Sequence, residues 1–137
     1  MGHYDILEHT ADIGLRARAD SLEELFAIAT EGMHAIAGTL HPAPEGEEIA
    51  LEVEADDLAG LLVEWLGEAL YVQDSRSASV AGIHLDEVSE RRARGVVRVR
   101  AFAGGHSDGV QIKAVTFHQL AVERSGDQWV ATVFFDI

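Results

Sequence analysis

The sequence predicts an α+β fold in which two helices pack on one face of a mainly antiparallel sheet of about six strands, a two-layer arrangement formed as a single domain over residues 1–137. Two amphipathic segments with helical periodicity, residues 21–38 and 57–72, predict the helices. The other segments alternate apolar and polar residues between short turn sequences, which is typical of antiparallel strands. A chain of 137 residues with 47% hydrophobic content is long enough to bury a core.

The first helix is expected after two short strands, residues 4–10 and 13–19, that are separated by a bend at Ala11 and Asp12. Ser21 followed by Glu24 matches a capping box, and Gly38 suits the left-handed position that ends a helix. The apolar residues between them fall on one helical face: Leu22, Leu25, Phe26, Ala29, Met33, Ile36 and Ala37. We therefore predict a helix over residues 21–38.

The second helix follows a proline-containing loop and a cleanly alternating strand at residues 49–55. Its apolar stripe comprises Leu58, Leu61, Leu62, Trp65, Leu66 and Ala69, and Asp56 or Asp57 can cap its start. Four further strands are predicted at residues 77–90, 95–103, 110–124 and 128–137. The sequence SGDQ predicts a hairpin turn between the last two.

Composition excludes several functional classes. Ten basic against 24 acidic residues give a net charge of −14, which repels phosphate backbones and disfavours direct high-affinity nucleic-acid binding. Such a surface suits a basic protein partner or divalent cations, and the alternative, which charge alone supports equally, is that it only keeps the protein soluble. The absence of cysteine excludes disulfides, thiolate zinc sites and cysteine nucleophiles. No apolar run approaches a membrane span and the first ten residues lack a signal-peptide core, so we expect a cytoplasmic protein without membrane contact.

Catalytic motifs are missing, whereas acidic residues gather in two places. The sequence contains no P-loop, dinucleotide-binding glycine motif or nucleophile elbow, which disfavours a stand-alone enzyme. Glu8, His9 and Asp12 lie within five residues, and Asp136 and the α-carboxylate of Ile137 follow an apolar strand. If the bend at Asp12 lies beside the last strand, these oxygens could bind calcium, magnesium or manganese. The alternative, which spacing alone favours, is that Asp12 satisfies turn amides and His9 packs in the core.

Two further residues could carry chemistry. Lys113 is the only lysine in the sequence, and the other nine basic residues are arginines. Lys113 and His118 are five residues apart on a predicted strand, so we expect them on opposite faces. Taken alone, each is more often structural than catalytic.

The segments EHTADIG, WLGEALY, IKAVTFHQLAV and the final FDI together resemble the archease family, over residues 4–137. The resemblance implies a function. Archeases are small protein cofactors of RtcB-type RNA ligases, which join RNA ends in tRNA splicing and RNA repair. They promote guanylylation of the ligase's active-site histidine and so sustain multiple turnover, without carrying the nucleotide themselves. The chain is then not an enzyme but an activator of one.

The resemblance also implies site residues. The family's metal-binding pocket matches Asp12, Asp136 and the carboxylate of Ile137, and Lys113 matches a lysine tied to activity. No catalytic role carries over to His9 or His118. Two other functions stay open: a chaperone-like binding module for tRNA-modifying enzymes such as a methyltransferase, and a metal-dependent hydrolase that uses His9, Asp12 and Asp136.

Overall fold

The computed structural model describes residues 2–8, 12–101 and 109–137. Its elements, in chain order, are β1 (His3–Glu8), β2 (Asp12–Ala19), α1 (Leu22–Ala37), β3 (Glu47–Glu54), α2 (Leu58–Ser75), β4 (Ala78–Val88), β5 (Arg92–Ala101), β6 (Ala114–Ser125) and β7 (Gln128–Asp136). The α+β class and both helices are confirmed.

The strands form two sheets rather than the one predicted. A four-stranded sheet has the order β1-β2-β7-β6, and a three-stranded sheet has the order β3-β5-β4. Every strand pair in the described part of the chain is antiparallel. The sequence could not reveal the division, because an alternating strand such as β3 buries one face equally well in either sheet.

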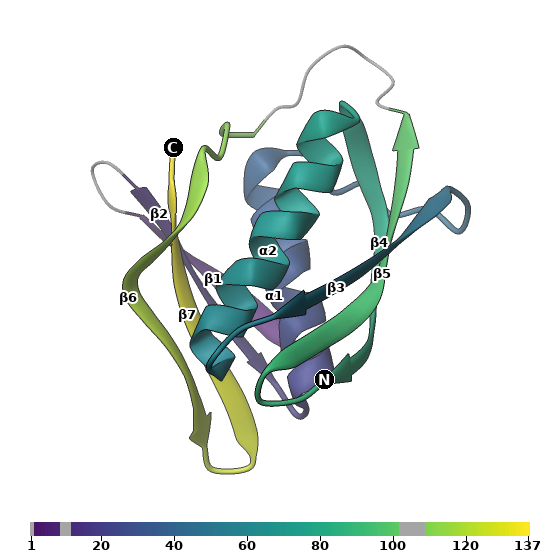
Figure 1. Cartoon of the computed structure of the whole chain (residues 1–137). Coiled ribbons are helices and arrows are strands. Elements are labelled where there is room, and N and C mark those ends of the chain that lie inside the picture. Colours follow the sequence, from purple (N-terminus) through teal and green to yellow (C-terminus); the bar gives the residue numbers. More distant parts are fainter. Residues whose placement is uncertain (1, 9–11, 102–108) are drawn as a thin grey trace.

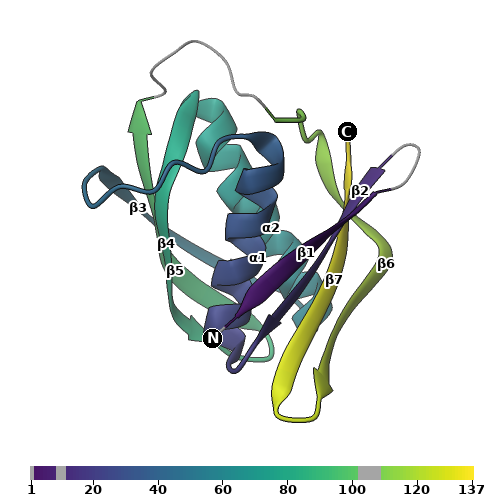
Figure 2. The same ribbon diagram turned by 180° about the vertical axis from the view of Figure 1, so that it is seen from behind.

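Both helices lie between the two sheets (Figure 1), and each contacts strands of both. Seen from behind, α1 lies nearer the viewer than α2, with the four-stranded sheet on one side of the helices and the three-stranded sheet on the other (Figure 2). The prediction of two layers with helices on one face is therefore wrong. The helices form the middle layer of three, since a hydrophobic stripe wide enough to face two sheets can be buried on both sides.

Local signals fix the ends of α1 as predicted. The hydroxyl of Ser21 accepts a hydrogen bond from the Glu24 N–H at 3.1 Å. At the other end Gly38 is left-handed, with φ of 71°, and its N–H donates to the carbonyl of Ala35. Helix α2 begins after the N-cap Asp57, which accepts from the Gly60 N–H at 2.7 Å. It continues three residues past the predicted end at residue 72.

The two helices are joined by a buried polar contact. Trp65 of α2 is fully buried, as the sequence predicted, and its indole N–H donates to the hydroxyl of Thr30 in α1 at 2.9 Å. That hydroxyl donates in turn to the carbonyl of Phe26 at 2.6 Å. The chain thus satisfies both polar side chains inside the apolar middle layer. No helix in the described residues is long and apolar enough to cross a bilayer.

Candidate functional site

Three chain segments meet at one end of the four-stranded sheet. Asp12, the first residue of β2, lies directly opposite Asp136, the last residue of β7. On the other side of β7, Ala114 of β6 is paired with Asp136, and the N–H of Lys113 donates to the Asp136 carbonyl at 2.8 Å. In Figure 1 the C-terminus therefore lies beside the start of β2 and the start of β6. We call the side chains of Asp12 and Asp136 the acidic tip.

Buried residues hold the end of β7 in place. Val133 and Phe135 are at most 1% exposed and belong to the central core, and Ile137 packs against that core. Side chains alternate along a strand, so Asp136 faces away from the helices and is exposed. The position of Asp136 is thus fixed by Phe135 and Ile137, its two neighbours in the sequence, which pack in or against the core.

The outer face of the sheet is fitted closely around Phe134. Its ring occupies the space above Gly14, because a Cβ atom added to Gly14 would lie 2.6 Å from the Phe134 ring. The ring of His118 meets Phe134 edge-on at 5.6 Å between centroids. Phe134 and Asp136 are two residues apart on β7, so a change at Gly14 would reach the acidic tip through this ring.

The two side chains of the acidic tip carry the same charge and occupy opposite cross-strand positions. Side chains directly opposite on antiparallel strands point to the same face, with Cβ atoms about 5 Å apart, and like charges there are destabilising. Within the described residues neither Asp12 nor Asp136 forms an ion pair. In that same part of the chain, no group of three or more His, Asp or Glu side chains is arranged to hold a metal. The tip itself offers two side-chain carboxylates.

Lys113 does not occupy the position that the sequence predicted. It precedes β6, and the pairing of β6 with β7 is irregular between Thr116 and Ala121, where Gln119 has a φ of 50°. The expectation that Lys113 and His118 lie on opposite faces of a regular strand therefore fails. The Lys113 side chain is exposed, forms no ion pair within the described residues, and lines a hollow against α2.

The histidines of the predicted cluster are not equivalent. His9 lies outside the described residues, as does the side chain of Glu8. His118 is described and exposed, and its backbone N–H donates to the Thr116 hydroxyl at 3.2 Å. Its ring packs on Phe134, which is a structural contact rather than one aimed at the acidic tip.

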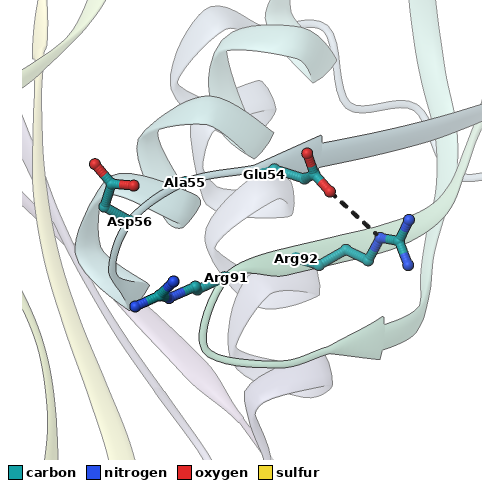
Figure 3. Close-up of a pocket in the computed structure, with 5 residues that line it drawn as sticks. All are labelled: Glu54, Ala55, Asp56, Arg91 and Arg92. Carbon is teal, nitrogen blue, oxygen red and sulfur yellow. Dashed lines mark ion pairs between the residues drawn. The ribbon is translucent and has the colours of Figure 1, made fainter.

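A polar hollow lies at the opposite end of the molecule, where β3 leads into α2 and β4 leads into β5. It is lined by Glu54, Ala55, Asp56, Arg91 and Arg92 (Figure 3). Arg92 is paired there with two carboxylates, Glu52 at 2.7 Å and Glu54 at 3.9 Å. Because Arg92 is already matched by carboxylates, this hollow resembles a solvated salt-bridge surface more than a reactive site.

Comparison with known proteins identifies the family. A family model described as the Archease protein family (MTH1598/TM1083) matches residues 4–137. The chain belongs to the archease family. Among curated archeases, that of Pyrococcus furiosus is 31% identical with both chains fully covered, and that of Methanosarcina mazei is 34% identical over 98% of this chain and 95% of its own.

Two solved structures have the same archease fold. The solution structure of Methanobacterium thermoautotrophicum protein 1598 has a TM-score of 0.77 at 26% identity and covers 98% of both chains. The crystal structure of an archease from Thermotoga maritima, described as a "possible chaperone", has a TM-score of 0.65 at 24% identity and covers 96% of this chain and 94% of that one. At that identity the second similarity concerns the fold alone.

The exposed side of α2 is a part of the surface for which the sequence predicted no function. In the sequence, the segment WLGEALY predicts the buried Trp65 and is one of the motifs that resemble the archease family. Its Gly67 sits in the middle of a helix, and its Tyr71 is 67% exposed. A glycine inside a helix and an aromatic residue between acidic ones were the available signals.

Proposed function

We propose that this archease activates an RNA ligase of the RtcB type. It promotes guanylylation of the ligase's active-site histidine and thereby sustains repeated turnover in tRNA splicing and RNA repair, without carrying the nucleotide or catalysing the reaction itself. Family membership supports this proposal. The observation that carries it is the position of Asp12 directly opposite Asp136, on an anchored strand end that can reach into a partner's site.

The acidic tip supplies some of the oxygen ligands that a hard divalent cation needs, namely the two side-chain carboxylates of Asp12 and Asp136. We propose that Asp12, Asp136 and the α-carboxylate of Ile137 hold calcium, magnesium or manganese. Two carboxylates in opposite cross-strand positions can reach one ion at the usual ligand distances of about 2.0–2.6 Å, and an ion there offsets their repulsion. When bound, the cation supplies positive charge for a triphosphate held by the ligase. The chain's own contribution is to position these oxygens.

Net charge supports a ligase partner rather than RNA. A ligase that binds RNA and triphosphates needs a positively charged groove, and this chain has a net charge of −14. Long-range attraction then accelerates the encounter and weakens as salt is added. Activation through such an encounter should be strongest at low ionic strength.

A guanylylation assay tests the proposal. A cognate ligase is incubated with GTP and manganese, with and without this chain at substoichiometric amounts. An activator that acts repeatedly raises the fraction of guanylylated ligase even when it is present well below the ligase concentration. Equal guanylylation with and without the chain would reject the proposal.

The terminal carboxylate has its own test. A C-terminal tag converts the α-carboxylate of Ile137 into a neutral amide, and deletion of Ile137 moves it about 3.3 Å back along the strand. Ligands of hard cations tolerate errors of only a few tenths of an ångström. Both changes should lower metal affinity by calorimetry and lower ligase activation. A tagged protein that binds metal and activates like the native one would remove Ile137 from the site.

A chaperone-like role for tRNA-modifying enzymes is the second candidate. The description of the Thermotoga maritima archease as a "possible chaperone" favours it. A chaperone is needed in roughly stoichiometric amounts and reduces the aggregation of its client. A metal-dependent hydrolase, the third hypothesis, would need no protein partner. Light scattering of a heated methyltransferase client distinguishes the second role from ligase activation.

A further inference from the structure

A groove runs between the exposed side of α2 and the segment that leads into β6. Its volume is about 400 Å³. Helix α2 contributes Glu64, Gly67, Tyr71 and Asp74, and the facing segment contributes Lys113 and Val115. We call it the α2–β6 groove. It begins beside the acidic tip, because Lys113 also donates its backbone N–H to Asp136.

No contact among the described residues requires a glycine at position 67. Gly67 lies in the middle of α2, where glycine is less favourable than alanine. Close contacts require glycine at Gly14 and Gly95, but a Cβ added to Gly67 would meet no atom of the described residues within 4 Å. The missing side chain therefore leaves space that nothing in the described part of the chain fills. That space is part of the α2–β6 groove.

The remaining groove residues indicate what would fill the space. Tyr71 exposes 67% of its surface, which leaves a ring face available for stacking. Glu64 and Asp74 are exposed and form no ion pairs within the described residues. A carboxylate on the three-stranded sheet is paired, by contrast, because Asp86 there forms an ion pair with Arg94 at 3.7 Å. The groove thus combines an aromatic face, an open floor and two carboxylates against one ammonium group.

We propose that the α2–β6 groove binds an arginine side chain presented by a segment of a protein partner. A guanidinium stacks on tyrosine and pairs with carboxylates, and its aliphatic stem needs an unobstructed surface such as the helix backbone at Gly67. The net negative charge of the groove disfavours RNA phosphates. The partner is the ligase, and in this respect the inference rests on the proposed function. The groove would then hold the ligase while the acidic tip engages its active site.

A titration of the chain alone tests the groove independently of any ligase. The probe is the blocked tripeptide acetyl-Ala-Arg-Ala-amide, followed by amide chemical shifts, with the glutamine tripeptide as control. The arginine peptide should shift the signals of Gly67, Tyr71 and Lys113, and Gly67→Leu should weaken its binding at least about tenfold. Shifts that are absent, spread over other surfaces, or unchanged by Gly67→Leu would overturn the inference.

Activation of the ligase provides the second test. Glu64→Lys should raise the concentration needed for half-maximal guanylylation by about tenfold. The matched control is Glu68→Lys, which makes the same charge change on the same helix at an exposed residue outside the groove lining, and it should have a much smaller effect. Equal effects of the two variants would overturn the groove as the docking site. If the native chain leaves guanylylation unchanged but binds the arginine peptide as predicted, the proposed function fails and the groove stands.

Gly67→Ala separates docking from folding. It should raise the melting temperature, because alanine restores helix propensity in open space, while it raises the half-maximal activating concentration. A variant that is more stable and activates as well as the native protein would count against the groove.

Discussion

Acid should destabilise this protein through one buried histidine, His34 of α1. The side chain is fully buried, its Nδ1 lies 3.1 Å from the Thr39 hydroxyl, and its Nε2 has no hydrogen-bond partner within the described residues. Burial lowers the pKa of His34 from 6.5 to about 4. The unfolded chain therefore binds this proton more readily than the folded chain.

The sign and size of the effect follow from this difference. Neutral His34 favours the folded state, so its contribution is fully present above the unfolded pKa of 6.5 and is lost as pH falls toward about 4. The difference between a pKa of 6.5 in the unfolded chain and about 4 in the folded chain corresponds to about 3 kcal/mol in total, of which about 2 kcal/mol is lost at about pH 5.

Denaturant unfolding of native and His34→Asn proteins across pH provides the assay, with the fluorescence of the two tryptophans, buried Trp65 and partly buried Trp129, as the signal. Asparagine can retain a bond to Thr39 but does not titrate, and subtracting the two curves cancels other groups such as Glu31, whose pKa is raised by burial. The native protein should lose about 3 kcal/mol more than the variant between neutral pH and about pH 4. Parallel curves would refute the assignment of this loss to His34.

Three further substitutions test the fold and the site. Thr30→Val leaves the Trp65 indole N–H without its acceptor and should cost about 1–3 kcal/mol of unfolding free energy in denaturant titration. Gly14→Ala drives a methyl group into the Phe134 ring and should cost about 1–3 kcal/mol while also reducing activation, because that ring precedes the acidic tip. Lys113→Ala should lower guanylylation with an unchanged melting temperature, since the side chain is exposed and unpaired within the described residues. A Lys113 variant that melts early instead would indicate a structural role.

The sequence predicted what local chemistry determines. The Ser21 and Gly38 signals placed both ends of α1, and the apolar stripe of α2 placed Trp65 in the core. The end of α2 was predicted three residues early because its last turn is polar. The irregular segment of β6 around Gln119 was not predicted, because it contains no glycine or asparagine that would mark a left-handed residue. The alternation does break there, since His118 and Gln119 are both polar and three apolar residues follow.

Non-local pairing was the part that the sequence could not supply. The division into two sheets depends on which strands pair, and alternation is the same for either partner. The proximity of Asp12 to Asp136 depends on β2 lying beside β7, two strands at opposite ends of the chain. From the sequence, only the resemblance to the archease family predicted that Asp12 and Asp136 belong to one site. The α2–β6 groove was not predicted, because the openness of Gly67 is visible only when its surroundings are known.

The most direct test of the central claim compares guanylylation of a cognate ligase by the native chain and by the Asp12→Asn, Asp136→Asn double variant. These substitutions keep the size of both side chains and remove the repulsion between them, so the fold should be as stable or more stable. The variant should melt no earlier than the native protein and should no longer accelerate guanylylation, even with added calcium, magnesium or manganese. A folded double variant that accelerates guanylylation as well as the native chain would show that the acidic tip is not needed for activation.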